Sequence, residues 1–162
     1  MRLRYVVALL ALVSLAAASP VLADTGFTAN LDAIQEVPTN GSTGTGTATL
    51  VLDAAQANLS YVVTFSGLTS NKTAAHIHGP AAPGFNAGVL HGLLNQTAAA
   101  TSGSANGVWA IPAANVTQLF NGQLYVNVHT VNFGGGEIRG QILGSPTAAN
   151  STTWGRLKKL YK

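Results

Sequence analysis

Two runs of alternating apolar and polar residues near the end of the chain predict a β-hairpin. Every second residue is apolar in residues 124–129, and a similar period of two returns in residues 137–142. The Gly-rich residues 131–135 predict the turn, which places Val128 opposite Ile138 on an apolar face. When the register is counted outward from the turn, Val126 also lies opposite Gly140 on this face. The polar face then has three pairs, which are His129 with Glu137, Asn127 with Arg139 and Tyr125 with Gln141.

Short alternating segments bounded by Gly, Pro or Asn predict further strands. Residues 112–121 instead have apolar residues at helical spacing, with Pro at the first helical position and Gly122 as a stop, so we expect one short helix there. Seven or eight strands with so little helix predict an all-β fold, an antiparallel Greek-key β-sandwich or an open barrel. The other predicted strands are residues 27–34, 44–52, 59–68, 73–78, 87–94 and 107–111, and residues 95–106 are expected to be a loop.

The first 23 residues have the pattern of a signal peptide. Two arginines precede an apolar run at residues 5–18, and residues 21–23 suit signal peptidase. The run is shorter than the roughly 20 residues of a spanning helix, which favours cleavage after Ala23 over an uncleaved membrane anchor. We therefore expect a mature domain at residues 24–144 that is secreted or periplasmic and has no transmembrane span.

Residues 145–162 have the composition of a linker followed by a basic C-terminal tail. Two interpretations of the tail remain open. It is either a frayed end of the chain or a segment that contacts an anionic envelope surface or a sorting machinery. Its cationic residues are Arg156, Lys158, Lys159 and Lys162.

Charge is scarce between Asp24 and Ser151, where Lys72 and Arg139 are the two basic residues against five acidic ones, a balance of −3. This balance excludes a nucleic-acid-binding surface. The chain has no cysteine, which excludes disulfides, thiolate catalysis and Cys-ligated zinc. The G-x-S-x-G motif of serine hydrolases is also missing, so we expect no hydrolase of that type.

Three of the four histidines are predicted to leave the same face of one sheet. His76 and His78 flank a core isoleucine on one strand, and His129 alternates with the core valines of the hairpin. If the two strands are close in space, the three imidazoles can bind copper or zinc. Glu137, predicted to face His129, would then accept the proton on the non-ligating nitrogen of that ring.

A second interpretation of these residues needs no metal. A His-x-His pair on a strand is a weak motif by itself, and His129 with Glu137 can form an ordinary cross-strand polar pair. Asn127 and Arg139 would extend the same polar face. His91 lies in a Gly-broken segment, so we do not include it in the predicted site.

Several of these segments resemble the CHRD domain, a module named from chordin. The matching motifs are AHIHGPA at 75–81, GVW at 107–109, LYVNVHT at 124–130 and GGEIRGQI at 135–142, within a resemblance that covers about residues 27–143. It implies an extracytoplasmic β-domain for which protein binding is the usual assumption. Our first hypothesis is therefore an exported, non-enzymatic protein that binds a protein or an envelope component.

A fainter similarity connects the chain with Cu/Zn superoxide dismutase, in which an H-x-H strand, a later His and a final strand with an Arg surround the metal. The four histidines occur in the corresponding order, but an Asp after His91, the disulfide cysteines and the long charged loop are missing. The similarity implies shared architecture rather than shared catalysis. The alternative function is therefore a copper-binding or zinc-binding protein with redox activity of this kind.

Overall fold

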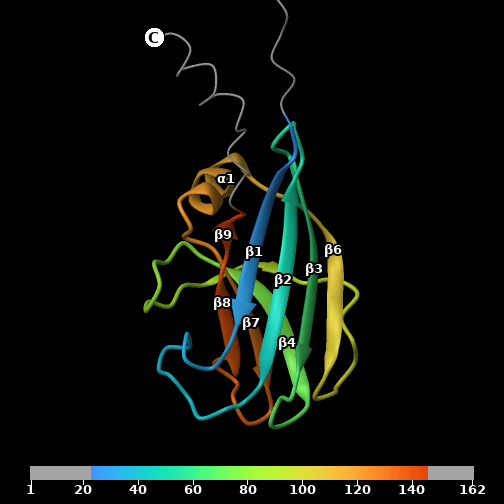
Figure 1. Cartoon of the computed structure of the whole chain (residues 1–162), viewed down its shortest axis with the longest axis vertical. Helices are drawn as coiled ribbons and strands as arrows, with labels where there is room; N and C mark the ends of the chain where they lie inside the picture. Colours follow the sequence, from blue (N-terminus) through green and yellow to red (C-terminus); the bar gives the residue numbers. More distant parts are fainter. Residues whose placement is uncertain (1–22, 146–162) are drawn as a thin grey trace, which may run out of the picture.

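The computed structural model describes residues 23–145, which form two antiparallel β-sheets and one short helix (Figure 1). The strand orders are β6-β3-β2-β1-β9 and β5-β4-β7-β8. The two sheets form a sandwich and not a closed barrel within these residues, so the predicted all-β fold with a helix near residues 112–121 is confirmed. The elements are β1 Thr25–Leu31, β2 Thr45–Leu52, β3 Asn58–Ser66, β4 Lys72–His78, β5 Val89–Gly92, β6 Gly103–Ala110, α1 Ala113–Phe120, β7 Tyr125–Thr130, β8 Ile138–Gln141 and β9 Leu143–Gly144.

The hydrophobic core lies between the sheets and follows from the alternation of the strands. Along β3 every second side chain is buried, beginning with Leu59, and the neighbouring polar residues face outward. Burying one such side chain contributes about 1.5–3 kcal/mol, which explains how a domain without disulfides is held together. The core includes Leu50, Leu59, Val63 and Phe65 from one sheet and Ile77, Val126, Val128 and Ile138 from the other.

The hairpin of β7 and β8 has the predicted register over four residue pairs. Val128 lies opposite Ile138, and Asn127 lies opposite Arg139. The pairing of His129 with Glu137 is not formed. Gly136 has φ of +136° and interrupts the alternation, and the Glu137 N–H donates to the carbonyl of Val128 at 2.8 Å.

Strand β6 begins earlier than the sequence indicated. Residues 103–106 were predicted to be a loop, but they pair with the end of β3, from Val62 opposite Asn106 to Phe65 opposite Gly103. Their small side chains carry little hydrophobic periodicity, so the pairing comes from the backbone of the neighbouring strand rather than from the local pattern.

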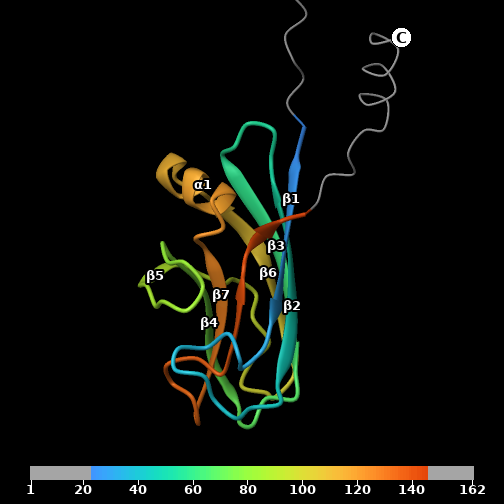
Figure 2. The same ribbon diagram turned by 60° about the vertical axis from the view of Figure 1, so that its left-hand side comes forward.

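The outer face of the four-stranded sheet is covered by two irregular segments, residues 32–44 and 79–88. Figure 2 shows both on the side of β7 that faces away from β2 and β3. They are joined to each other where the Asn86 side-chain amide donates to the carbonyl of Val37 at 2.7 Å. All six residues of β7 are buried, so the prediction of a half-buried strand is wrong for β7.

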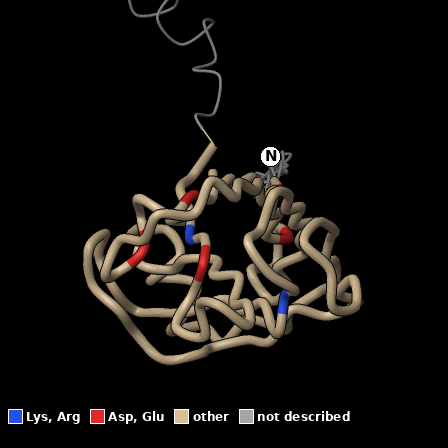
Figure 3. Tube along the Cα trace, turned by 90° about the horizontal axis from the view of Figure 1, so that it is seen from below, with Lys and Arg blue, Asp and Glu red and all other residues tan. Residues whose placement is uncertain are grey.

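The described domain carries few charged residues, as Figure 3 shows along the backbone. The predicted signal peptide at residues 1–23 and the predicted tail at residues 145–162 lie, apart from Ala23 and Ser145, outside the described residues. Between residues 23 and 145 there is no helix with the length and hydrophobicity needed to cross a membrane.

Candidate metal centre

Neighbouring strands β4 and β7 bring His76, His78 and His129 together on the covered outer face of the sheet. The register places His76 opposite Asn127 and Ala74 opposite His129. One nitrogen from each of the three imidazoles lies within 4.8 Å of the others. The side chains therefore meet at one point, although they come from positions about 50 residues apart in the chain.

Backbone carbonyls determine which ring nitrogen carries the proton in two of these histidines. His78 Nδ1 lies 3.0 Å from the Ala87 carbonyl, and His129 Nδ1 lies 3.1 Å from the Gly134 carbonyl. A carbonyl only accepts, so each Nδ1 must be the donor, and each neutral ring then has an unprotonated Nε2.

The two unprotonated Nε2 atoms of His78 and His129 face each other at 3.3 Å. Both rings are neutral near pH 7, because burial lowers the pKa of His78 and lowers that of His129 to about 4. Two nitrogen lone pairs at this distance repel unless a cation or a proton lies between them. Two ligands of a tetrahedral zinc ion, each about 2.0–2.1 Å from the metal, are about 3.3 Å apart.

His76 supplies the third imidazole of the group. Its ring centroid lies 5.0 Å from that of His129 and 5.5 Å from that of His78. Its Nδ1 is buried and has no hydrogen-bond partner among the described residues. Burial lowers the pKa of this ring as well, so three neutral imidazoles meet here.

Glu137 does not lie at this site, so the prediction that it orients His129 is wrong. Its carboxylate accepts hydrogen bonds from the Ser42 hydroxyl, from the Thr130 hydroxyl and from the N–H and hydroxyl of Thr69. These bonds hold its pKa below the ordinary value although burial opposes them. The carbonyl of Gly134 orients His129 instead.

Asn127 and Arg139 lie on the same outer face as the histidines, as predicted, but they are buried. Tyr125 connects Arg139 with the histidines. The Tyr125 ring stacks on His78 at an interplanar angle of 14°, and the Arg139 guanidinium carbon lies 3.5 Å from the centroid of the same ring. The phenol and the guanidinium thus support one wall of the imidazole cluster.

Glu36 belongs to the covering segment and was not predicted as a site residue. It is 4 % exposed, and its Oε1 has no hydrogen-bond partner. Burial raises the pKa of its carboxyl to about 7, although Arg139 counteracts this shift. The side-chain oxygen of Asn127 is likewise buried without a partner.

His91 lies apart from the cluster, in agreement with its omission from the predicted site. It is paired with Ile77 across β4 and β5, stacks on Trp109 at an interplanar angle of 11° and makes a 3.1 Å hydrogen bond with the Tyr61 hydroxyl. Its contacts are those of a histidine that packs against the core.

These features define an antiparallel β-sandwich with a three-histidine candidate metal centre on the outer face of one sheet. The chain belongs to the CHRD domain family, whose model matches residues 27–142. This confirms the resemblance found in the sequence motifs. No curated protein and no solved structure matches the chain significantly.

Proposed function

We propose that this CHRD protein is exported and is a non-enzymatic binding protein that holds a copper or zinc ion with His76, His78 and His129. The pair of unprotonated Nε2 atoms on His78 and His129, 3.3 Å apart, carries the proposal. Their neutral state and their separation both suit coordination of one cation.

The hydrogen bonds of the rings support coordination further. Histidines that bind a metal usually donate the other ring N–H to a carbonyl or a carboxylate, which fixes the ring and its tautomer. The carbonyls of Ala87 and Gly134 have this role for His78 and His129. Copper is bound more tightly than zinc by most nitrogen sites, so we expect copper to be preferred when both ions are present at equal concentration.

Export and a partner outside the cytoplasm are supported by the family and by the sequence. CHRD domains are found in extracellular or secreted proteins, and the first 23 residues have the pattern of a signal peptide. We propose a protein or an envelope component as the partner. The basic tail would contact an anionic surface or a sorting machinery.

Protein purified from its native compartment tests both parts of this proposal. Mass spectrometry of the purified protein is expected to find Asp24 at the N-terminus, and elemental analysis is expected to find one copper or zinc ion per chain. A chain that retains residues 1–23 would contradict export with cleavage. A cleaved chain without either metal, which also takes up neither ion in dialysis, would contradict the metal site.

A further inference from the structure

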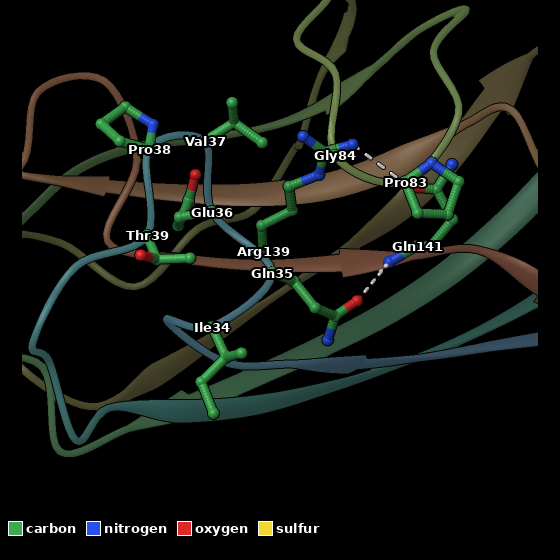
Figure 4. A pocket seen from close by; sticks show the side chains of 10 residues that line it. All are labelled: Ile34, Gln35, Glu36, Val37, Pro38, Thr39, Pro83, Gly84, Arg139 and Gln141. Atoms are coloured by element: carbon green, nitrogen blue, oxygen red, sulfur yellow. Dashed lines mark hydrogen bonds between the residues drawn. The ribbon is translucent and has the colours of Figure 1, made fainter.

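A cavity of about 460 Å³ lies between the two covering segments and β8. Its walls include Ile34, Val37 and Pro38 on one side and Pro83 and Gly84 on the other. In Figure 4 the Arg139 side chain rises between these two sides, with Glu36 next to it. The volume lies within the range of about 300–1,000 Å³ found for small-ligand pockets, and the walls are largely apolar.

Arg139 is a buried cation that has no carboxylate among its hydrogen-bond acceptors. It is 1 % exposed. Its hydrogen bonds within the described chain go to the Phe85 carbonyl, the Asn86 side-chain carbonyl and the Gln141 side-chain carbonyl, and none goes to a carboxylate. These bonds use three of the five guanidinium N–H donors. Buried charges are normally paired, so the two remaining donors indicate a place for an anion.

Glu36 is only partly ionised near neutral pH, so it does not fully neutralise the charge of Arg139. The burial that raises its pKa to about 7 keeps about half of the carboxyl groups protonated near neutral pH. A protonated carboxyl can donate to an acceptor, which would fit beside a bound anion without repulsion. The Oε1 of Glu36 lies on the side of Gly136 and the Asn127 side chain, so this oxygen does not neutralise the guanidinium through a hydrogen bond.

We infer that the cavity binds a small organic carboxylate, with its carboxylate on Arg139 and a compact apolar body against Ile34, Val37 and Pro38. This site is separate from the three histidines and does not depend on a bound metal. Guanidinium donors match a carboxylate in geometry, and the apolar walls favour an aliphatic or aromatic body over a sugar or a phosphate.

Calorimetric titration of the mature protein with benzoate tests the inference, with benzamide as the neutral analogue of the same shape. We expect one benzoate per chain with a dissociation constant in about the millimolar range or below, and benzamide at least about tenfold weaker. Equal affinities for the two compounds, or no heat from benzoate at about 10 mM, would overturn the inference.

Two variants locate the binding without removing the buried arginine. Ile34 lines the cavity and is 80 % exposed, so Ile34→Asp is expected to preserve the fold. Its added negative charge is expected to lower the affinity for benzoate at least about threefold by repulsion. Val62→Asp, on the outer face of the other sheet, is the matched control and is expected to leave the affinity unchanged. Equal loss in both variants, or no loss in Ile34→Asp, would place benzoate elsewhere and overturn the inference.

The pH dependence gives an independent result. Arg139 from β8 is the charged group that faces Glu36, while β7 and the 131–136 loop contribute the uncharged Asn127 and Gly136. Ionisation of Glu36 between about pH 6 and 8 adds a negative charge beside the bound carboxylate, so benzoate affinity should fall as the pH rises. In Glu36→Gln the affinity should not change over this interval. A wild-type affinity that is constant from pH 6 to 8 would contradict the arrangement.

Discussion

Replacing His129 by alanine is expected to lower the affinity for Cu²⁺ by about 100-fold. Zinc sites with four protein ligands bind with about 10–16 kcal/mol, so one ligand is worth about 3 kcal/mol, and each 1.4 kcal/mol is tenfold in affinity. The Nε2 of His129 also lies 3.3 Å from the Nε2 of His78. Titration of the mature protein with Cu²⁺ in a competing chelator measures the change.

The matched control for this experiment is His91→Ala. His91 is a histidine of the same sheet, but it stacks on Trp109 and is not part of the cluster. We expect His78→Ala to lose about as much affinity as His129→Ala, and His91→Ala to keep the wild-type affinity. Thermal unfolding of each variant without metal checks that the fold is preserved. Wild-type affinity in His78→Ala and His129→Ala would show that copper binds elsewhere.

Replacing Gly140 by alanine is expected to destabilise the domain by about 3 kcal/mol. The added Cβ would lie 2.5 Å from the carbonyl oxygen and 2.9 Å from the carbonyl carbon of Asn30, and both are backbone atoms that cannot turn aside. The segment that follows Asn30 is bridged to β8 by reciprocal hydrogen bonds between Asp32 and Arg139. Relieving the contact therefore requires β1 and β8 to separate. The expected loss of stability is like that of a core into which an extra methyl group is forced.

Gly135→Ala is the control for this substitution because it lies in the turn of the same hairpin. An added Cβ at Gly135 meets no atom within 4 Å, so we expect a change within about 0.5 kcal/mol. Urea unfolding followed by circular dichroism measures both variants. Equal stability of Gly140→Ala and Gly135→Ala would contradict the close approach of β1 and β8.

The alternation of residues was sufficient to predict the hairpin and the side of the sheet on which the histidines lie. A period of two assigns His76 and His78 to one face whatever the neighbouring strand is. The same rule failed at Glu137, because the positive φ of Gly136 turns the following side chain toward Ser42, Thr69 and Thr130. A Gly-Gly-Gly turn signals a change of direction, but not its angle.

The cover over the polar face could not be predicted from the sequence. Residues 32–44 and 79–88 have no hydrophobic period, so their place in the fold depends on individual hydrogen bonds such as that from Asn86 to Val37. The burial of Glu36 and Arg139 follows from this cover. The carbonyls that set the histidine tautomers belong to the backbone of Ala87 and Gly134, for which a sequence carries no side-chain signal.

The most direct test of the metal centre is electron paramagnetic resonance of the mature protein loaded with one Cu²⁺ per chain. We expect hyperfine splitting from three imidazole nitrogens, one each from His76, His78 and His129. His129→Ala is expected to show one nitrogen fewer, and His91→Ala the wild-type spectrum. A wild-type spectrum of Cu²⁺ with oxygen ligands, or one that does not change in His129→Ala, would contradict the three-histidine site.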